Sequence, residues 1–135
     1  MAFAPFPNAF DTESSLNGSR HAIVKFTAGT AGAAPSSLTR GKEYVSSTTK
    51  STNDYVLALR NKWAFLGSYN VQVRQASFSA AGACYGTVSV DNVAGSTPSV
   101  TISFYKGSDG TAVALATGDV VTIDLELSNV QIAAI

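Results

Sequence analysis

Charged residues are scarce in this sequence of 135 residues. Lys, Arg, Asp and Glu make up 13% of the chain, whereas a typical globular domain has about 25%. Nine basic and nine acidic residues give a formal net charge of zero, and the basic residues are scattered singly. No basic stripe is available for a phosphate backbone, so we expect no direct binding to nucleic acid.

Residues suited to disulfide, metal or nucleophile chemistry are also few. Cys84 is the only cysteine and His21 the only histidine. An intramolecular disulfide is therefore impossible, and the sequence has no CxxC motif for zinc and no GxSxG motif for a catalytic serine. We interpret His21 as a surface residue at the start of a strand, and we expect no metal, no cofactor and no small-molecule substrate.

Long apolar runs are missing too. No stretch approaches the roughly 20 residues of a membrane span. The first basic residue is Arg20, and Pro5, Pro7 and Asp11 interrupt the stretch in which the apolar part of a signal peptide would lie. We therefore expect no signal peptide and no membrane partner.

Small residues are abundant where charge is missing. The chain has 17 serines, 13 threonines and 20 alanines. Serine and threonine suit the strands of an all-β domain, which is one explanation. The other is that much of the surface meets other protein, because a free monomer usually keeps more surface charge. The composition leaves both explanations open.

The clearest periodic stretch is 119–127, where apolar and polar residues alternate strictly. This alternation predicts a strand with one buried and one wet face. A slip of one residue would bury Asp124 and Glu126, so we expect this strand to set the register of its neighbours. The two parities are Val121, Ile123, Leu125 and Leu127 on the buried side, and Thr122, Asp124 and Glu126 on the other.

Seven such stretches, separated by Gly, Pro, Asn and Asp, predict an all-β fold. We expect a single β-sandwich, jelly-roll-like, with about seven or eight antiparallel strands in a domain spanning 21–135. Residues 28–43 form a long loop, too small in its side chains and too flexible for a core element. The predicted strands are 21–27, 44–50, 54–60, 69–77, 84–90, 99–106 and 119–127.

Residues 1–20 differ from the rest and are predicted to form an extended N-terminal arm. Phe3, Phe6 and Phe10 alternate with prolines, which favour extended backbone. Disordered segments are poor in aromatics, so this arm has a surface to dock. It either binds a partner subunit through its phenylalanines or folds back over its own sandwich.

Two other groups of residues are candidates for function. Trp63 and Phe65 flank a predicted turn, where their rings would anchor an interface, plug the end of the sandwich or stack on a sugar. Asp124 and Glu126 lie two residues apart on one strand face. They have the residue types of a glycosidase acid and base, although the simpler interpretation is a solvated strand face.

Several short strings of the sequence support a family resemblance. They are Leu38-Thr39-Arg40-Gly41, Tyr55-x-Leu57-x-Leu59, Phe65-Leu66-Gly67, Ala116-Thr117-Gly118-Asp119-Val120-Val121 and Leu125-x-Leu127-x-Asn129. With these strings, residues 38–129 resemble small all-β proteins of tailed-bacteriophage heads, of the capsid decoration or cement type. The resemblance implies a non-enzymatic virion protein, made in the host cytoplasm, that binds the major capsid protein on the capsid surface. It also implies a homo-oligomer, and trimers are common among such proteins.

Two alternatives remain beside the resemblance. A carbohydrate-binding β-sandwich of a tail fibre or adhesin would use Trp63, Phe65 and Tyr105. A glycosidase-like hydrolase would depend on Asp124 and Glu126.

Overall fold

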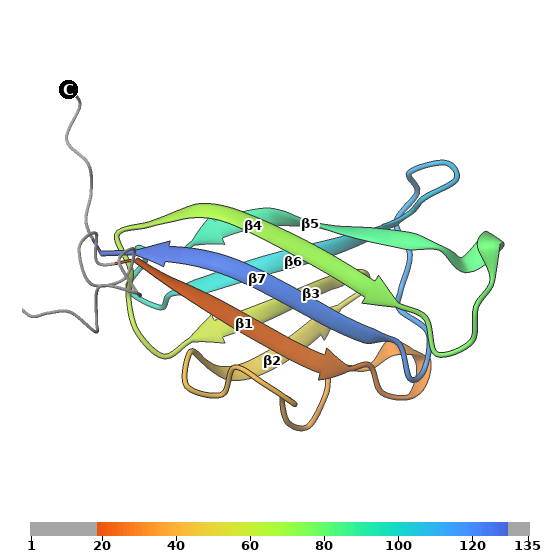
Figure 1. The fold of residues 1–135 in the computed structure, drawn as a ribbon, viewed down its shortest axis with the longest axis horizontal. Coiled ribbons are helices and arrows are strands. Elements are labelled where there is room, and N and C mark those ends of the chain that lie inside the picture. The colour runs from red at the N-terminus through yellow and green to blue at the C-terminus, as the bar shows by residue number, and fades with distance from the viewer. Residues whose placement is uncertain (1–18, 130–135) are drawn as a thin grey trace, which may run out of the picture.

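The structure, a computed structural model, describes residues 19–129. Its seven strands form two antiparallel sheets packed as two layers, with the three-stranded sheet in front of the four-stranded sheet in Figure 1. The predicted all-β sandwich is confirmed. The strands are β1 (Ser19–Thr27), β2 (Val45–Ser51), β3 (Asp54–Leu59), β4 (Phe65–Arg74), β5 (Cys84–Asn92), β6 (Ser99–Lys106) and β7 (Val120–Ser128).

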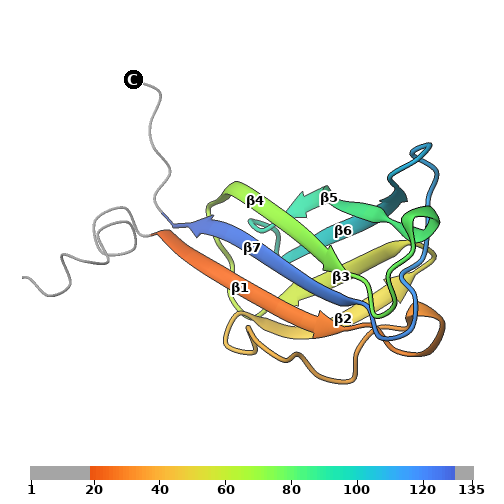
Figure 2. The same ribbon diagram turned by 45° about the vertical axis from the view of Figure 1, so that its right-hand side comes forward.

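The strand order is β1-β7-β4 in one sheet and β2-β3-β6-β5 in the other. The first strand therefore pairs with the last, and β3 pairs with β6 inside that outer pair. This nested pairing is the scheme of a jelly roll, here built with seven strands. Figure 2 shows the same two layers from a second direction. The two helical turns, η2 (Thr30–Gly32) and η3 (Ala80–Gly82), are three residues each, and no helix within residues 19–129 is long and apolar enough to cross a membrane.

β7 lies in the middle of the three-stranded sheet, as the alternation in 119–127 predicts. Ala22 of β1 pairs with Leu125, and Val71 of β4 pairs with Ile123. Leu125 and Ile123 are fully buried between the sheets. The strand begins one residue later than predicted, because Asp119 is a buried loop residue instead of a strand residue.

The centre of the core is aromatic. Tyr55 from β3 lies between Phe26 of β1 and Phe104 of β6, and all three side chains are fully buried. The ring centroids of Tyr55 and Phe104 are 5.3 Å apart in an edge-on arrangement, and those of Tyr55 and Phe26 are 5.7 Å apart. Such pairs add about 0.5–1.5 kcal/mol each beyond the apolar area they bury, so this cluster holds the two sheets together.

Two predicted details are wrong. The strand expected at 69–77 spans Phe65–Arg74, because Phe65 and Leu66 already pair with β7 before a break in register. The loop 28–43 contains no strand, yet two of its side chains reach the core: Ala28 and Leu38 are 3% and 7% exposed. Backbone bonds between Lys25 and the loop residues 39 and 40 hold this loop against β1, so small side chains here do not mean a detached loop. β1 begins at Ser19, inside the segment assigned to the arm.

Candidate functional site

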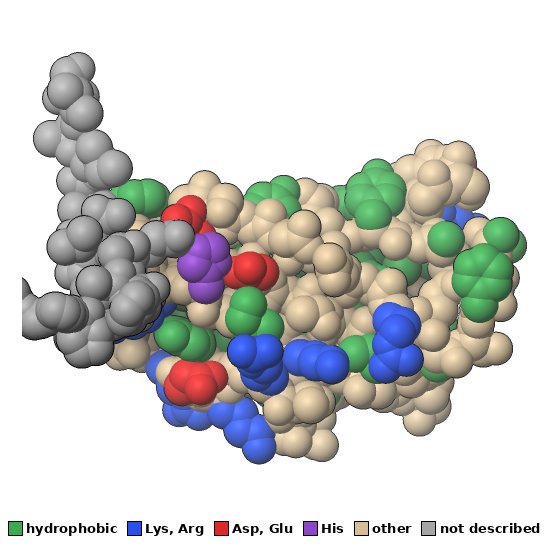
Figure 3. Space-filling view, viewed as in Figure 1, with side chains coloured by type: hydrophobic (Ala, Val, Ile, Leu, Met, Phe, Trp, Pro, Cys, Tyr) green, Lys and Arg blue, Asp and Glu red, His purple; other side chains and the backbone are tan. Residues whose placement is uncertain are grey.

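The outer face of the three-stranded sheet brings together His21 and Asp124. His21 Nδ1 lies 3.0 Å from Asp124 Oδ1, and the two side chains are 47% and 40% exposed. Figure 3 shows the histidine between acidic side chains, with a row of Lys and Arg side chains on the same face. An exposed pair of this kind is worth at most about 1 kcal/mol.

The second predicted carboxylate has a different partner. Ser68 donates a hydrogen bond to Glu126 Oε1 at 3.1 Å, and Glu126 is the cross-strand neighbour of His21. Gly67 leaves room for this carboxylate, since an added Cβ would lie 2.5 Å from Glu126 Oε1. Ser68 thus bonds a carboxylate and not the imidazole that would have to activate it as a nucleophile. The four side chains form two hydrogen-bonded pairs rather than one Ser-His-Asp relay.

The described residues offer neither a cluster of metal ligands nor a reactive thiol. Residues 19–129 contain no group of three or more His, Cys, Asp or Glu side chains placed to hold a metal ion. Cys84 is half-buried at the start of β5. Burial raises the pKa of its thiol, and the negative charge of Asp119 raises it further. A raised pKa keeps the thiol protonated and slows its reactions.

The structure places Trp63 and Phe65 near one end of the sandwich. Trp63 is 8% exposed and belongs to the core, and its backbone N–H donates to Val93 O at 2.9 Å. Its buried indole Nε1 has no hydrogen-bond partner. Phe65 is partly buried as the first residue of β4. Only the edge of Trp63 can therefore reach a ligand. The other predicted partner-binding residues, Phe3, Phe6 and Phe10, lie outside the described residues.

The outer face of the four-stranded sheet is the most distinctive surface of the molecule. Core residues of β3 and β6 point toward the other sheet, so the alternate residues point outward. Only one outward side chain, Asp54, is charged. We name this surface the outer face of β2-β3-β6-β5, and its residues, placed by strand register and by the contact of Ser89 with Ser103, are Ser47, Thr49, Ser51, Asp54, Val56, Ala58, Tyr85, Thr87, Ser89, Val90, Asn92, Ser99, Thr101, Ser103 and Tyr105.

Even the single charge on this face is held within a hydrogen-bonded row. Ser103 Oγ donates to Asp54 Oδ1 at 2.5 Å and lies 2.6 Å from Ser89 Oγ. Ser103 is 2% exposed and Thr101 is 8% exposed, although both point away from the core. Side chains of the neighbouring strands therefore cover them, as the hydrogen bonds of Ser103 to Asp54 and Ser89 indicate.

Aromatic and apolar groups lie at the β5 side of the same face. The Tyr85 and Tyr105 rings pack with centroids 5.8 Å apart, and Tyr85 is 49% exposed. Val90 is 51% exposed. In the loop before β5, Phe78 is 86% exposed. These are the described aromatic groups best placed to meet a partner. The sequence offered one signal for them, since residues 75–90 contain no charge.

Comparison of the chain with family models, with curated proteins and with solved structures gave no match. Its function is therefore inferred from the surfaces described above.

Proposed function

We propose that this chain is a non-enzymatic structural protein of a virion, which binds the outside of a capsid and stabilises it as a decoration or cement protein. The observation that supports this most is the outer face of β2-β3-β6-β5, whose only charged residue is Asp54. The cores of protein–protein interfaces are depleted in charge and enriched in tyrosine. The face has both properties, with Tyr85 and Tyr105 packed at one side.

The mechanism needs no chemistry beyond binding. A protein that binds the assembled shell and not its free subunits stabilises the shell by mass action. Many copies on one lattice strengthen attachment when they also contact one another, because each bound copy raises the effective concentration for the next. The partners in this proposal are the major capsid protein and further copies of this chain, arranged as a homotrimer.

The test is binding of the purified chain to capsids built from the major capsid protein of the same genome. Val56 lies on the proposed face and pairs with Thr101, so Val56→Lys would place a charge in its middle. We expect this variant to bind at least tenfold more weakly, which corresponds to about 1.4 kcal/mol. Gln72→Lys is the matched control, because Gln72 is exposed on the other sheet. It should bind as the unchanged chain does.

Two results would refute the proposal. One is that the unchanged chain fails to bind capsids and is missing from purified particles. The other is equal binding by Val56→Lys and Gln72→Lys, with both variants shown to be folded by circular dichroism; this would remove the outer face of β2-β3-β6-β5 from the mechanism.

The predicted arm adds a separate test. Deleting residues 1–18 removes Phe3, Phe6 and Phe10 and stops before β1. We expect the sandwich to stay folded and attachment to weaken. Undiminished attachment would exclude the arm while leaving the sheet face in place.

A further inference from the structure

A cavity of about 210 Å³ lies between the loop that follows β1 and the edge strand β2. Its walls come from three parts of the chain: the loop before β2, β2 itself and the residue after β3. The side chains important here are Ser36, Ser37, Leu38, Lys42, Thr48 and Arg60. The cavity is smaller than the roughly 300–1,000 Å³ of sites for drug-sized ligands, but several times the roughly 30 Å³ of a water molecule.

The charge of this cavity is one-sided. Lys42 and Arg60 line it, and no Asp or Glu does. Within residues 19–129 the only ion pair is the distant one between His21 and Asp124, so neither cation is neutralised by a described acidic side chain. In a chain with so little charge, two cations beside one cavity attract an anion.

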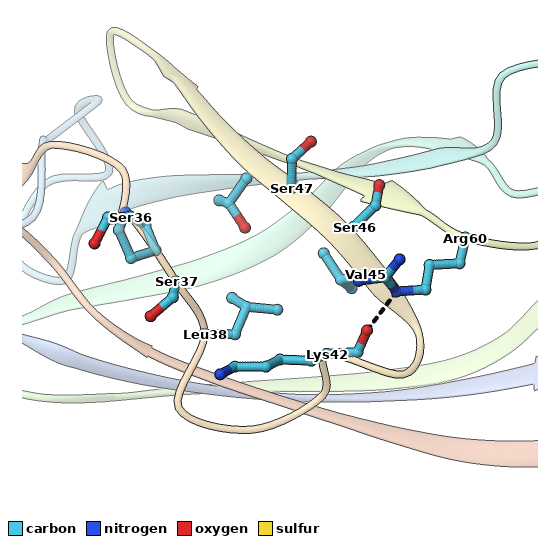
Figure 4. A pocket seen from close by; sticks show the side chains of 10 residues that line it. Ser36, Ser37, Leu38, Lys42, Val45, Ser46, Ser47 and Arg60 are labelled. Atoms are coloured by element: carbon cyan, nitrogen blue, oxygen red, sulfur yellow. Dashed lines mark hydrogen bonds between the residues drawn. The ribbon is translucent and has the colours of Figure 1, made fainter.

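Arg60 is held in position by the backbone. Its Nε donates to Lys42 O at 2.5 Å, and its backbone N–H donates to Tyr44 O at 2.9 Å. The two terminal nitrogens of the guanidinium remain available as donors. Figure 4 shows Arg60 turned toward Val45 and Lys42 extending below Leu38, with Ser36 and Ser37 on the opposite side. Arg60 and the pair Ser36 and Ser37 therefore lie on opposite sides of the cavity, and the Lys42 side chain extends between them toward Ser37.

One polar atom in the wall lacks a partner. The hydroxyl oxygen of Thr48 is buried and makes no hydrogen bond. A buried hydroxyl without a partner is unfavourable, and a ligand oxygen that accepts a hydrogen bond from it would remove this cost. This orphaned donor is independent of the two charges and belongs to the same cavity.

We propose that this cavity binds a small tetrahedral oxyanion of the phosphate or sulfate class. A guanidinium fork, an ammonium group and hydroxyl donors approach from different sides, which suits an anion with several acceptor oxygens. Leu38 and Val45 supply the apolar part of the wall, while the side chains of Lys42 and Arg60 are exposed and accessible to an ion from solution. This proposal does not depend on the capsid proposal: the cavity lies beside the edge strand β2 and shares with the outer face of β2-β3-β6-β5 only Ser47, at the rim of that face.

The experiment is an amide NMR titration of the full chain with inorganic phosphate and with sulfate, each compared with chloride at equal ionic strength. We expect saturable shifts at residues 36–37 and 46–48. Arg60→Gln should weaken binding at least tenfold. Lys62→Gln, the control, removes an exposed charge that does not line the cavity and should leave binding unchanged. Thr48→Val should weaken binding several-fold while leaving the free protein at least as stable.

Three results would overturn the proposal. The first is that phosphate and sulfate give no shifts beyond those of chloride. The second is an equal loss of binding in Arg60→Gln and Lys62→Gln, which would show general attraction to surface charge. The third is that an uncharged sugar such as glucose gives the same saturable shifts as phosphate, because the cavity would then recognise hydroxyl groups and not an anion.

Discussion

The Asp119 carboxylate reaches across 43 residues of sequence to Ala76, whose N–H donates to Oδ1 at 3.1 Å. The other carboxylate oxygen accepts the N–H of Ala116 at 2.9 Å. The backbone carbonyl of the same residue accepts the N–H of Ala28 at 2.8 Å. Asp119 is 5% exposed. Through its carboxylate and its backbone carbonyl, Asp119 thus joins the loops that follow β1, β4 and β6.

Asp119→Asn should destabilise the fold. An amide has one acceptor oxygen, so its NH₂ group would face a backbone donor and leave one buried N–H unpaired. We expect the free energy of unfolding to fall by about 2–3 kcal/mol, measured by urea denaturation. Asp124→Asn is the matched control on the exposed strand face, where the loss should stay below about 1 kcal/mol. Equal losses at the two positions would contradict the role given to Asp119.

The buried Tyr55 makes stability depend on alkaline pH. Burial raises its pKa from 10.0 to about 12. Because the folded pKa is the higher one, the unfolded chain loses this proton first. The contribution is fully present below pH 10 and is lost as the pH rises toward 12, by up to about 3 kcal/mol in total. Urea midpoints measured from pH 8 upward should show this decline.

Tyr55→Phe separates this effect from other alkaline titrations. The hydroxyl of Tyr55 donates to Gly32 O, so the variant should be less stable at pH 7 by about 1–2 kcal/mol. It should also lose the part of the pH dependence that comes from Tyr55. A Tyr55→Phe profile parallel to that of the unchanged chain above pH 10 would show that another group titrates there.

Gly41 fills a position where a side chain has no room. Its φ is +95°, and an added Cβ would lie 2.6 Å from Ile23 O and 2.9 Å from Val24 Cα. These atoms belong to the backbone of β1 and cannot move aside as a flexible side chain would. Gly41→Ala should therefore lower the free energy of unfolding by about 2 kcal/mol or more. Gly107→Ala, whose nearest contact would be 3.5 Å, should change it by less than about 0.5 kcal/mol.

Cys84 should react slowly in the folded protein. Burial raises the pKa of its thiol, so less thiolate is present at a given pH than in the unfolded chain. We expect iodoacetamide to modify native Cys84 at least tenfold more slowly than the urea-unfolded chain at pH 8. The native rate should also rise at higher pH, as followed by mass spectrometry. A native rate equal to the unfolded rate would mean that the thiol is accessible and its pKa unshifted.

Alternation predicted the strands well because it reports directly which residues face the core. Ile123 and Leu125 are fully buried and Asp124 is 40% exposed, as the pattern in 119–127 indicates. The start of β4 is not predicted, because the alternation breaks there. Gly67 and Ser68 interrupt the alternation where the register with β7 breaks, so Phe65 and Leu66 look like part of a turn.

The site was harder to predict because its members come together only through strand pairing. Ser103 and Asp54 are separated by 49 residues, yet they are direct cross-strand neighbours. Nothing in their local sequence indicates a shared hydrogen bond. Trp63 has the same difficulty, since one tryptophan after a turn fits an exposed anchor and a core residue equally well. Its burial is decided by contacts with distant segments such as Val93.

The pairing of Ser19 with Ser128 has a practical consequence for engineering this protein. Because β1 and β7 are antiparallel neighbours, the described chain starts and finishes at the same pole of the sandwich, as Figure 1 shows. The turn at residues 107–110 lies at the opposite pole. A circular permutant opened in that turn, with Ser19 and Ser128 joined through a linker, would keep the ladders between the seven strands intact, and a reporter fused in the turn would lie at the pole opposite to Ser19 and Ser128.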